Sequence, residues 1–475
     1  MIEARLASDR AAEQNPRGLL AALLIELAMI FGGGGSTAPA SELALEAFAA
    51  AILAGWLWLD RASSFRHAPH SLWIILALTI AVPTLQLAPL PPALWHRLPG
   101  HDVERAALAL VGQADSWRAW SVAPSRTLAT LLSLGPCLLV MVMTAGLARA
   151  GRTQAVAMVA AVGGLAMLVG AAQMAGGDAG TFRFYGTRSG NLEGFQANRN
   201  HAADVLLIGM VAFAAAAREW QQRWRSGQSG PVASGPAFPA AVLGVSALFS
   251  IATVVTASRA GAALLPLGWL GVLLVLRPWL RFDRRALVAL AVAAVLAALA
   301  GAWVVQHNHV IARITARFTL DQEFRPRIWA DSLYAARTYL PLGSGMGTFV
   351  PVFQAIERLE NVDVFLTNRA HNDYLELAIE GGAAALAALL VIAAVIVRRA
   401  GIGIRRPPAG SMPQVVFALV TLSVIALHSL VDYPLRSMSL QCLAGLAVGL
   451  LMASSDSHRT SLRVPRETAS MKDDL

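Results

Sequence analysis

Long apolar runs recur along almost the whole chain, and they constrain the fold more than any other feature. A membrane-spanning helix needs roughly 20 mainly apolar residues, and twelve runs approach this length. They cover residues 18–36, 42–59, 71–90, 127–148, 153–175, 200–217, 239–257, 260–277, 285–305, 376–397, 412–431 and 436–453. Only 14% of the residues are charged, against about 25% in soluble proteins. The sequence therefore predicts an all-α integral membrane protein with about 12 transmembrane helices.

Arginines predict the orientation of these helices. When the N-terminus is placed in the cytosol, every cytosolic loop carries at least two arginines, as the positive-inside rule requires. Topology thus explains the net charge of +9, and we expect no nucleic-acid partner. Residues 1–17 are expected to form a cytosolic tail, and the polar residues 454–475 a disordered one.

One polar segment, 306–375, divides the predicted spans into a group of nine at 18–305 and a group of three at 376–453. It carries seven arginines on the outer side, against the positive-inside trend. Binding an anion is the simplest reason for such arginines, because a guanidinium fork matches phosphate oxygens. We therefore expect a long, partly helical external loop that carries out chemistry or binding.

Two outer segments have the pattern of interfacial helices. Apolar residues recur at helical spacing in 101–120 and in 324–340. In the second segment, the spacing of Arg327 and Asp331 allows them to share a face. The sequence PLGSGMG (341–347) is expected to end that helix.

Two arginines are the first candidates for the site. Arg259 lies in a short TASRAG turn between two apolar runs. Burying an unpaired guanidinium near lipid costs free energy, and arginines in such positions are usually functional. The alternative is an arginine whose side chain extends to the interface. Arg327 is the second candidate, with a salt bridge to Asp331 as its alternative. The neighbouring Arg325 is a weaker candidate for substrate binding.

His371 in RAHNDYLE is the third candidate. A histidine at the mouth of a membrane cavity can accept a proton from an acceptor hydroxyl. Asp373 or Glu376 could orient it. In the alternative interpretation, Asn372 or Asp373 caps the following helix and His371 is incidental.

Two further segments carry polar residues at the ends of predicted spans. Asn198, Arg199 and Asn200 begin one span; a helix start of this kind can bind phosphate or sugar, or can simply be capped by asparagine. His428 and Asp432 have a spacing that can bind metal, but this signal is weak, and we favour a structural role. We expect no metal site and no cofactor.

In their order along the chain, these motifs resemble the O-antigen ligase and O-antigen polymerase family of bacterial membrane glycosyltransferases. The resemblance extends over about 195–440 and rests on the SRAG turn, on RIW before PLGSGMGTF, on AHNDYLELAIEGG and on HSLVDYPL. It implies a fold related to the lipid-sugar glycosyltransferases, in which the long, partly helical loop 306–375 is the periplasmic catalytic loop.

The resemblance also implies the chemistry. The donor would be an undecaprenyl-pyrophosphate-linked glycan, and the acceptor a hydroxyl of a lipid A core or of a growing polysaccharide. Transfer would be metal-independent and inverting, at the periplasmic face of the bacterial inner membrane. By the resemblance, Arg259 and Arg327 hold the pyrophosphate and His371 assists transfer, and we expect these three residues to meet around one cavity. Further contacts to substrate are expected from Arg325, Arg188, Arg199, Asn372 and Asp373.

The family motifs do not separate a ligase from a polymerase or from a protein glycosyltransferase. A different class of protein, a flippase for lipid-linked oligosaccharides, would also have about 12 helices and arginines in a cavity. We expect a flippase to carry charges on both sides of the membrane midplane, whereas here they concentrate on the outer side. A third interpretation, an assembly protein without catalysis, is disfavoured by the arginines and the histidine.

Overall fold

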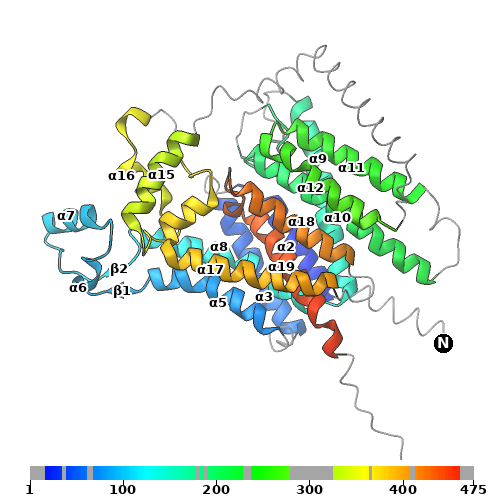
Figure 1. The fold of residues 1–475 in the computed structure, drawn as a ribbon, viewed down its shortest axis with the longest axis horizontal. Helices are drawn as coiled ribbons and strands as arrows, with labels where there is room; N and C mark the ends of the chain where they lie inside the picture. Colours follow the sequence, from blue (N-terminus) through cyan, green and yellow to red (C-terminus); the bar gives the residue numbers. More distant parts are fainter. Residues whose placement is uncertain are drawn as a thin grey trace, which may run out of the picture.

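The computed structural model describes residues 16–34, 39–60, 68–176, 182–185, 190–227, 237–278, 325–362, 366–405 and 412–460. Almost all of the regular structure in these segments is helical (Figure 1). The long helices are α2 (Pro16–Phe31), α3 (Pro39–Asp60), α5 (His70–Gln86), α8 (Pro124–Gly146), α9 (Arg149–Ala175), α10 (Arg199–Gly227), α11 (Ala237–Val255), α12 (Arg259–Leu276), α17 (Asp373–Arg405), α18 (Met412–His428) and α19 (Met438–Thr460). Each predicted span except the ninth coincides with one of these helices. The ninth, 285–305, lies outside the described residues.

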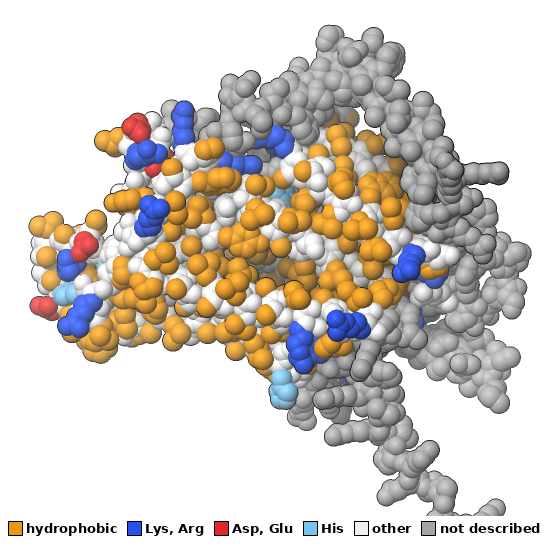
Figure 2. Space-filling view, viewed as in Figure 1, with side chains coloured by type: hydrophobic (Ala, Val, Ile, Leu, Met, Phe, Trp, Pro, Cys, Tyr) orange, Lys and Arg blue, Asp and Glu red, His pale blue; other side chains and the backbone are white. Residues whose placement is uncertain are grey.

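Seven helices of the described chain are long and apolar enough to cross a membrane, and α5, α18 and the apolar part of α19 are shorter. A broad apolar surface covers the helices, and charged side chains gather at its borders (Figure 2). The prediction of an all-α membrane protein is therefore confirmed, whereas the number of crossings stays a prediction.

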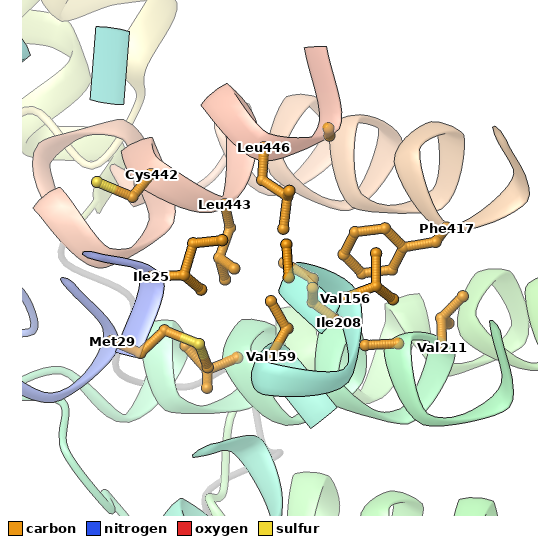
Figure 3. Packing of buried hydrophobic residues seen from close by; sticks show 14 of the residues in the cluster. Ile25, Met29, Val156, Val159, Ile208, Val211, Phe417, Cys442, Leu443 and Leu446 are labelled. Atoms are coloured by element: carbon orange, nitrogen blue, oxygen red, sulfur yellow. The ribbon is translucent and has the colours of Figure 1, made fainter. Parts of the chain in front are cut away.

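The core of the helical body lies where α2, α9, α10, α18 and α19 meet (Figure 3). Small residues allow these helices to approach closely, which is the main route to tight packing in lipid. A Cβ atom added to Gly163 of α9 would lie 3.3 Å from the Cα of Gly209 in α10, and one added to Gly151 would lie 3.3 Å from the Cα of Gly18 in α2.

Polar contacts divide the helix ends into two sets, as alternating antiparallel spans require. At one end, the start of α9 contacts the end of α10 through Arg149 and Glu219 (2.9 Å) and the start of α18 through Arg152 and Gln414 (3.1 Å). At the opposite end lie the starts of α10, α12 and α17 and the end of α18. The second set builds the candidate site.

Short elements cover this second end of the bundle (Figure 1). They are α6 (Pro92–Trp95), α7 (Asp102–Leu110), the antiparallel strands β1 (Pro89–Leu90) and β2 (Arg118–Ala119), α15 (Arg325–Tyr339), α16 (Phe349–Ile356), η4 (Leu359–Asn361) and η5 (Pro434–Arg436). The interfacial helix predicted over 101–120 is shorter than expected. It ends at Leu110, because Gly112 adopts a φ of +68° and the chain returns as β2. The helix predicted over 324–340 is confirmed as α15.

The glycine-rich segment after α15 packs into a kink of α17. Gly382 has a φ of +61° inside the helix, and the kink frees backbone groups for bonds with the segment. Ser344 N donates to Ile379 O (2.9 Å), and Ala383 N donates to Pro341 O (2.8 Å). The predicted end of the helix at 341–347 is confirmed, and the segment also fixes α15 against α17.

Candidate functional site

A polar cluster occupies the covered end of the bundle. Its side chains come from the start of α10, from α15, from the residues before and within the first turns of α17, and from the loop between α18 and α19. Its centre is Asp432, whose side chain is fully buried.

His371 contacts this buried carboxylate. Its Nδ1 lies 3.2 Å from Asp432 Oδ1, and its ring packs edge-on against Tyr433, with the ring centroids 5.0 Å apart. The backbone of His371 has a φ of +51°, a left-handed conformation that costs a non-glycine residue about 1–2 kcal/mol. Such strained residues concentrate at functional sites.

Three other groups also contact Asp432. Asn200 Nδ2 donates a hydrogen bond to its Oδ2, and Tyr433 N donates to its Oδ1 (3.0 Å). Arg325 forms an ion pair with it at 3.9 Å. Burial raises the pKa of Asp432, but the hydrogen bond with His371 and the nearby histidines outweigh burial and hold the pKa well below its usual range. Asp432 is therefore an ionised partner for His371.

Tyr433 contacts two histidines. Its ring packs against those of His371 and His201, and the His201 ring centroid is 5.1 Å away. Burial and the charge of Asp432 raise the pKa of Tyr433, while a hydrogen bond with Asn198 lowers it less. The phenol is thus neutral and packs against both imidazoles.

The two asparagines at the start of α10 have different roles: Asn198 caps the helix, and Asn200 contacts the polar cluster. Asn198 Oδ1 accepts a hydrogen bond from Asn200 N (2.8 Å), so the capping alternative is confirmed for Asn198. Asn200 instead reaches Asp432. Of the neighbouring arginines, Arg199 is half-buried at the first residue of the helix, and Arg188 lies outside the described residues. Arg183, on the same outer side, is paired with Glu193 at 3.2 Å.

Asn372 and Asp373 hold the backbone of the site. Asn372 Oδ1 accepts from Leu375 N (2.9 Å) and caps α17, so the expected cap is confirmed, whereas His371 makes its own contact with Asp432. Asp373 accepts hydrogen bonds from Ser429 Oγ (2.9 Å) and Leu435 N (3.1 Å). These contacts tie the start of α17 to the α18–α19 loop. They favour positioning over the substrate contacts that the sequence led us to expect.

Buried carboxylates on α17 share Arg436 from the α18–α19 loop. Its side chain lies 2.8 Å from Glu380 and 3.3 Å from Glu376. Arg369 adds a second guanidinium, 2.9 Å from Glu376. The carboxylate that contacts His371 is that of Asp432, and the expected role of Asp373 or Glu376 in orienting His371 stays a prediction.

Arg259 lies at the same end of the bundle. It is the first residue of α12, after Ser258, whose Oγ accepts a hydrogen bond from Gly261 N (3.1 Å). Gly261 lies against Ala203 in the first turns of α10, beside the asparagines. The short turn predicted between two spans is confirmed.

Of the two candidate arginines in α15, Arg325 and not Arg327 reaches the polar cluster. Arg325 pairs with Asp432, whereas Arg327 is exposed and makes no hydrogen bond or ion pair with the described residues. The alternative salt bridge between Arg327 and Asp331 does not form, because Asp331 is buried and binds Arg358 at 2.6 Å. Trp329, next along the helix, donates from Nε1 to Ala370 O (3.0 Å) and places α15 beside His371. The expected meeting of Arg259, Arg327 and His371 is thus shown only as far as a common end of the bundle.

Sequence reasoning missed the central role of Asp432. The HSLVDYPL motif singled the residue out, but its pairing with His371 joins segments 61 residues apart. Only the tertiary structure brings these segments together. Among the described residues, no group of three or more His, Cys, Asp and Glu side chains could hold a metal ion.

The fold and the site together define a class: a multi-pass helical membrane protein that gathers histidines, arginines and buried carboxylates at one end of its bundle. Residues 244–390 match the family model described as O-Antigen ligase. This match supports the predicted resemblance to the O-antigen ligase and polymerase family, which implies a glycosyltransferase-like enzyme that acts on lipid-linked polysaccharide. The matched segment includes Arg259, Arg325, Arg327 and His371. A search among curated proteins finds no significant match.

Proposed function

We propose that this protein transfers a glycan from an undecaprenyl-pyrophosphate carrier to an acceptor hydroxyl at the periplasmic face of the inner membrane. The observation that carries the proposal is the His371–Asp432 pair, with Arg325 beside it, in a chain whose residues 244–390 match the O-antigen ligase family. The pair has the geometry of a base oriented by a carboxylate. Arginines around it are suited to a diphosphate.

The residues divide the reaction between them. With Nδ1–H directed to Asp432, the imidazole carries its lone pair on Nε2, where it accepts the proton of the acceptor hydroxyl. The hydroxyl oxygen forms the new bond to the anomeric carbon and inverts its configuration. The bond from that carbon to the diphosphate breaks, and Arg259 and Arg327 neutralise the charge that develops on the leaving group. This division requires neither a metal nor a cofactor.

Transfer by purified protein in liposomes tests the proposal, with lipid-linked donor and acceptor supplied on the outer face. We expect Arg259→Ala, Arg327→Ala and His371→Ala to insert normally but to lose transfer. Arg337→Ala is the matched control, because this arginine is also exposed on α15 and is assigned no role. Full transfer by all three variants would refute the site assignment.

The same assay does not distinguish a ligase from a polymerase, because both enzymes use the same donor. Deletion of the gene separates them in a gel of surface polysaccharide. Loss of capped lipopolysaccharide indicates a ligase, with a lipid A core as acceptor. Loss of long chains with single units retained indicates a polymerase.

One observation favours a transporter as the second candidate. Charged side chains are also buried at the opposite end of the bundle, those of Arg152 and Glu219, so charge does not concentrate on one side as fully as the sequence suggested. A flippase would give no product when donor and acceptor are both supplied on the outer face. Product formation in that arrangement would exclude it.

A further inference from the structure

A second histidine–carboxylate pair lies beside the first. His428, the last residue of α18, places Nδ1 2.6 Å from Asp204 Oδ1 in α10. Both side chains are completely buried. The proposed reaction does not use this pair.

The pair connects directly to Asp432 through the backbone. The carbonyl of His428 accepts a hydrogen bond from Asp432 N at 2.9 Å. The bond to Asp204 therefore fixes the end of α18 against α10, and with it the turn that carries Asp432. Asn200, one turn before Asp204 on α10, bonds the Asp432 side chain. The same helix thus holds Asp432 by its backbone and by its carboxylate.

The pair also lies close to other charged and titratable groups of the cluster. His428 Nε2, Asp204 Oδ2 and His201 Nε2 are buried without a hydrogen-bond partner among the described residues. Charged and titratable groups that act on the pair include His201 of α10, Arg325 of α15 and Asp432 of the α18–α19 loop.

We propose that Asp204 and His428 form a positioning dyad, which holds Asp432 in place and so fixes the tautomer of His371 with its proton on Nδ1. The dyad does not touch substrate; it acts through Asp432. The consequence for transfer rests on the proposed function, whereas the consequence for the tautomer does not.

The experiment compares Asp204→Asn, His428→Gln and the double variant. Each single substitution nearly preserves side-chain volume but replaces the imidazole–carboxylate bond by a weaker one that involves an amide. We expect kcat for glycan transfer to fall about 10–100-fold, with KM within about threefold, since an interaction that orients a base acts in the transition state. The double variant should be no slower than the slower single variant, because the two residues act as one unit.

A spectroscopic measurement makes the test independent of catalysis. The ¹⁵N shifts of His371 in labelled protein report its tautomer without substrate, and replacement of His371 assigns the signal. We expect a single tautomer in the unaltered protein and a mixture of tautomers in both single variants. Thr421→Val is the control, because it alters a buried hydroxyl on α18 two turns before His428 and should change neither readout.

The outcomes are distinguishable. An unchanged tautomer in both single variants overturns the dyad. So does a double variant whose loss equals the product of the single losses, or a loss of kcat matched by Thr421→Val. If the unaltered protein transfers no glycan although His371 holds one tautomer that the variants disturb, the dyad stands and the proposed function fails.

Discussion

At the residue scale, the site depends on one carboxylate, that of Asp432. Asp432→Asn should keep the shape of the site but allow His371 the wrong tautomer, as an amide can present its NH₂ to the ring. We expect kcat to fall by about 10²–10⁴ with little change in KM, which is the scale seen when the carboxylate of a catalytic triad is replaced by an amide. Asp331→Asn is the control, because it alters a buried carboxylate of α15 that binds Arg358 instead. Equal losses in both variants would contradict the prediction.

The pKa of the same residue predicts a pH dependence of stability. A carboxyl whose folded pKa lies below its unfolded value, about 3.9 for aspartate, stabilises the fold above that value. The contribution is lost as pH falls toward the folded pKa. Thermal unfolding in detergent should therefore show Asp432→Asn less stable than the unaltered protein at pH 7. The difference should shrink below about pH 4; a difference that stays constant down to pH 3 would show that Asp432 is not held ionised.

At the scale of elements, the site depends on how the glycine-rich segment fits the kink of α17. A Cβ atom on Gly343, whose φ is +84°, would lie 2.5 Å from Glu380 O and 2.6 Å from Gly382 N, both of them backbone atoms that cannot rotate away. Gly343→Ala should destabilise the fold by more than the roughly 1–2 kcal/mol that a left-handed alanine costs by itself. Gly112→Ala is the matched control, since Gly112 has a φ of +68° and nothing lies within 4 Å of the added atom. Thermal unfolding measures both variants, and equal losses would show that the close packing contributes nothing.

How far the elements could be predicted follows from the range of the forces involved. Apolar runs and a capping asparagine act locally, so the spans and the caps at Asn198 and Asn372 could be read from the chain. The orientation of α15 could not be, because Trp329 and Arg325 turn toward partners far along the chain at Ala370 and Asp432. The spacing of Arg327 and Asp331 fits a shared helical face, but tertiary contacts decided which side of the helix was buried.

At the scale of the whole molecule, the arrangement requires the two sets of helix ends to lie on opposite sides of a membrane. Substituted cysteines test this in cells, after Cys137 and Cys442, the two native cysteines, have been replaced by alanine. Leu359→Cys lies in η4 beside α16, at the end that holds the site, and Ile404→Cys lies near the end of α17 at the other. Both positions are at least half exposed, at 92% and 50%, so a difference in labelling cannot arise from burial within the protein.

A maleimide that cannot cross the inner membrane should label Leu359→Cys in cells whose outer membrane has been made permeable. It should label Ile404→Cys only after the inner membrane is broken. The reverse pattern would place His371, Asp432 and the arginines in the cytosol. The proposed donor is taken at the outer leaflet, so transfer on the periplasmic side would then be impossible, whatever the geometry of the site. Labelling of both positions in unbroken cells would instead contradict the assignment of α17 as a membrane-spanning helix.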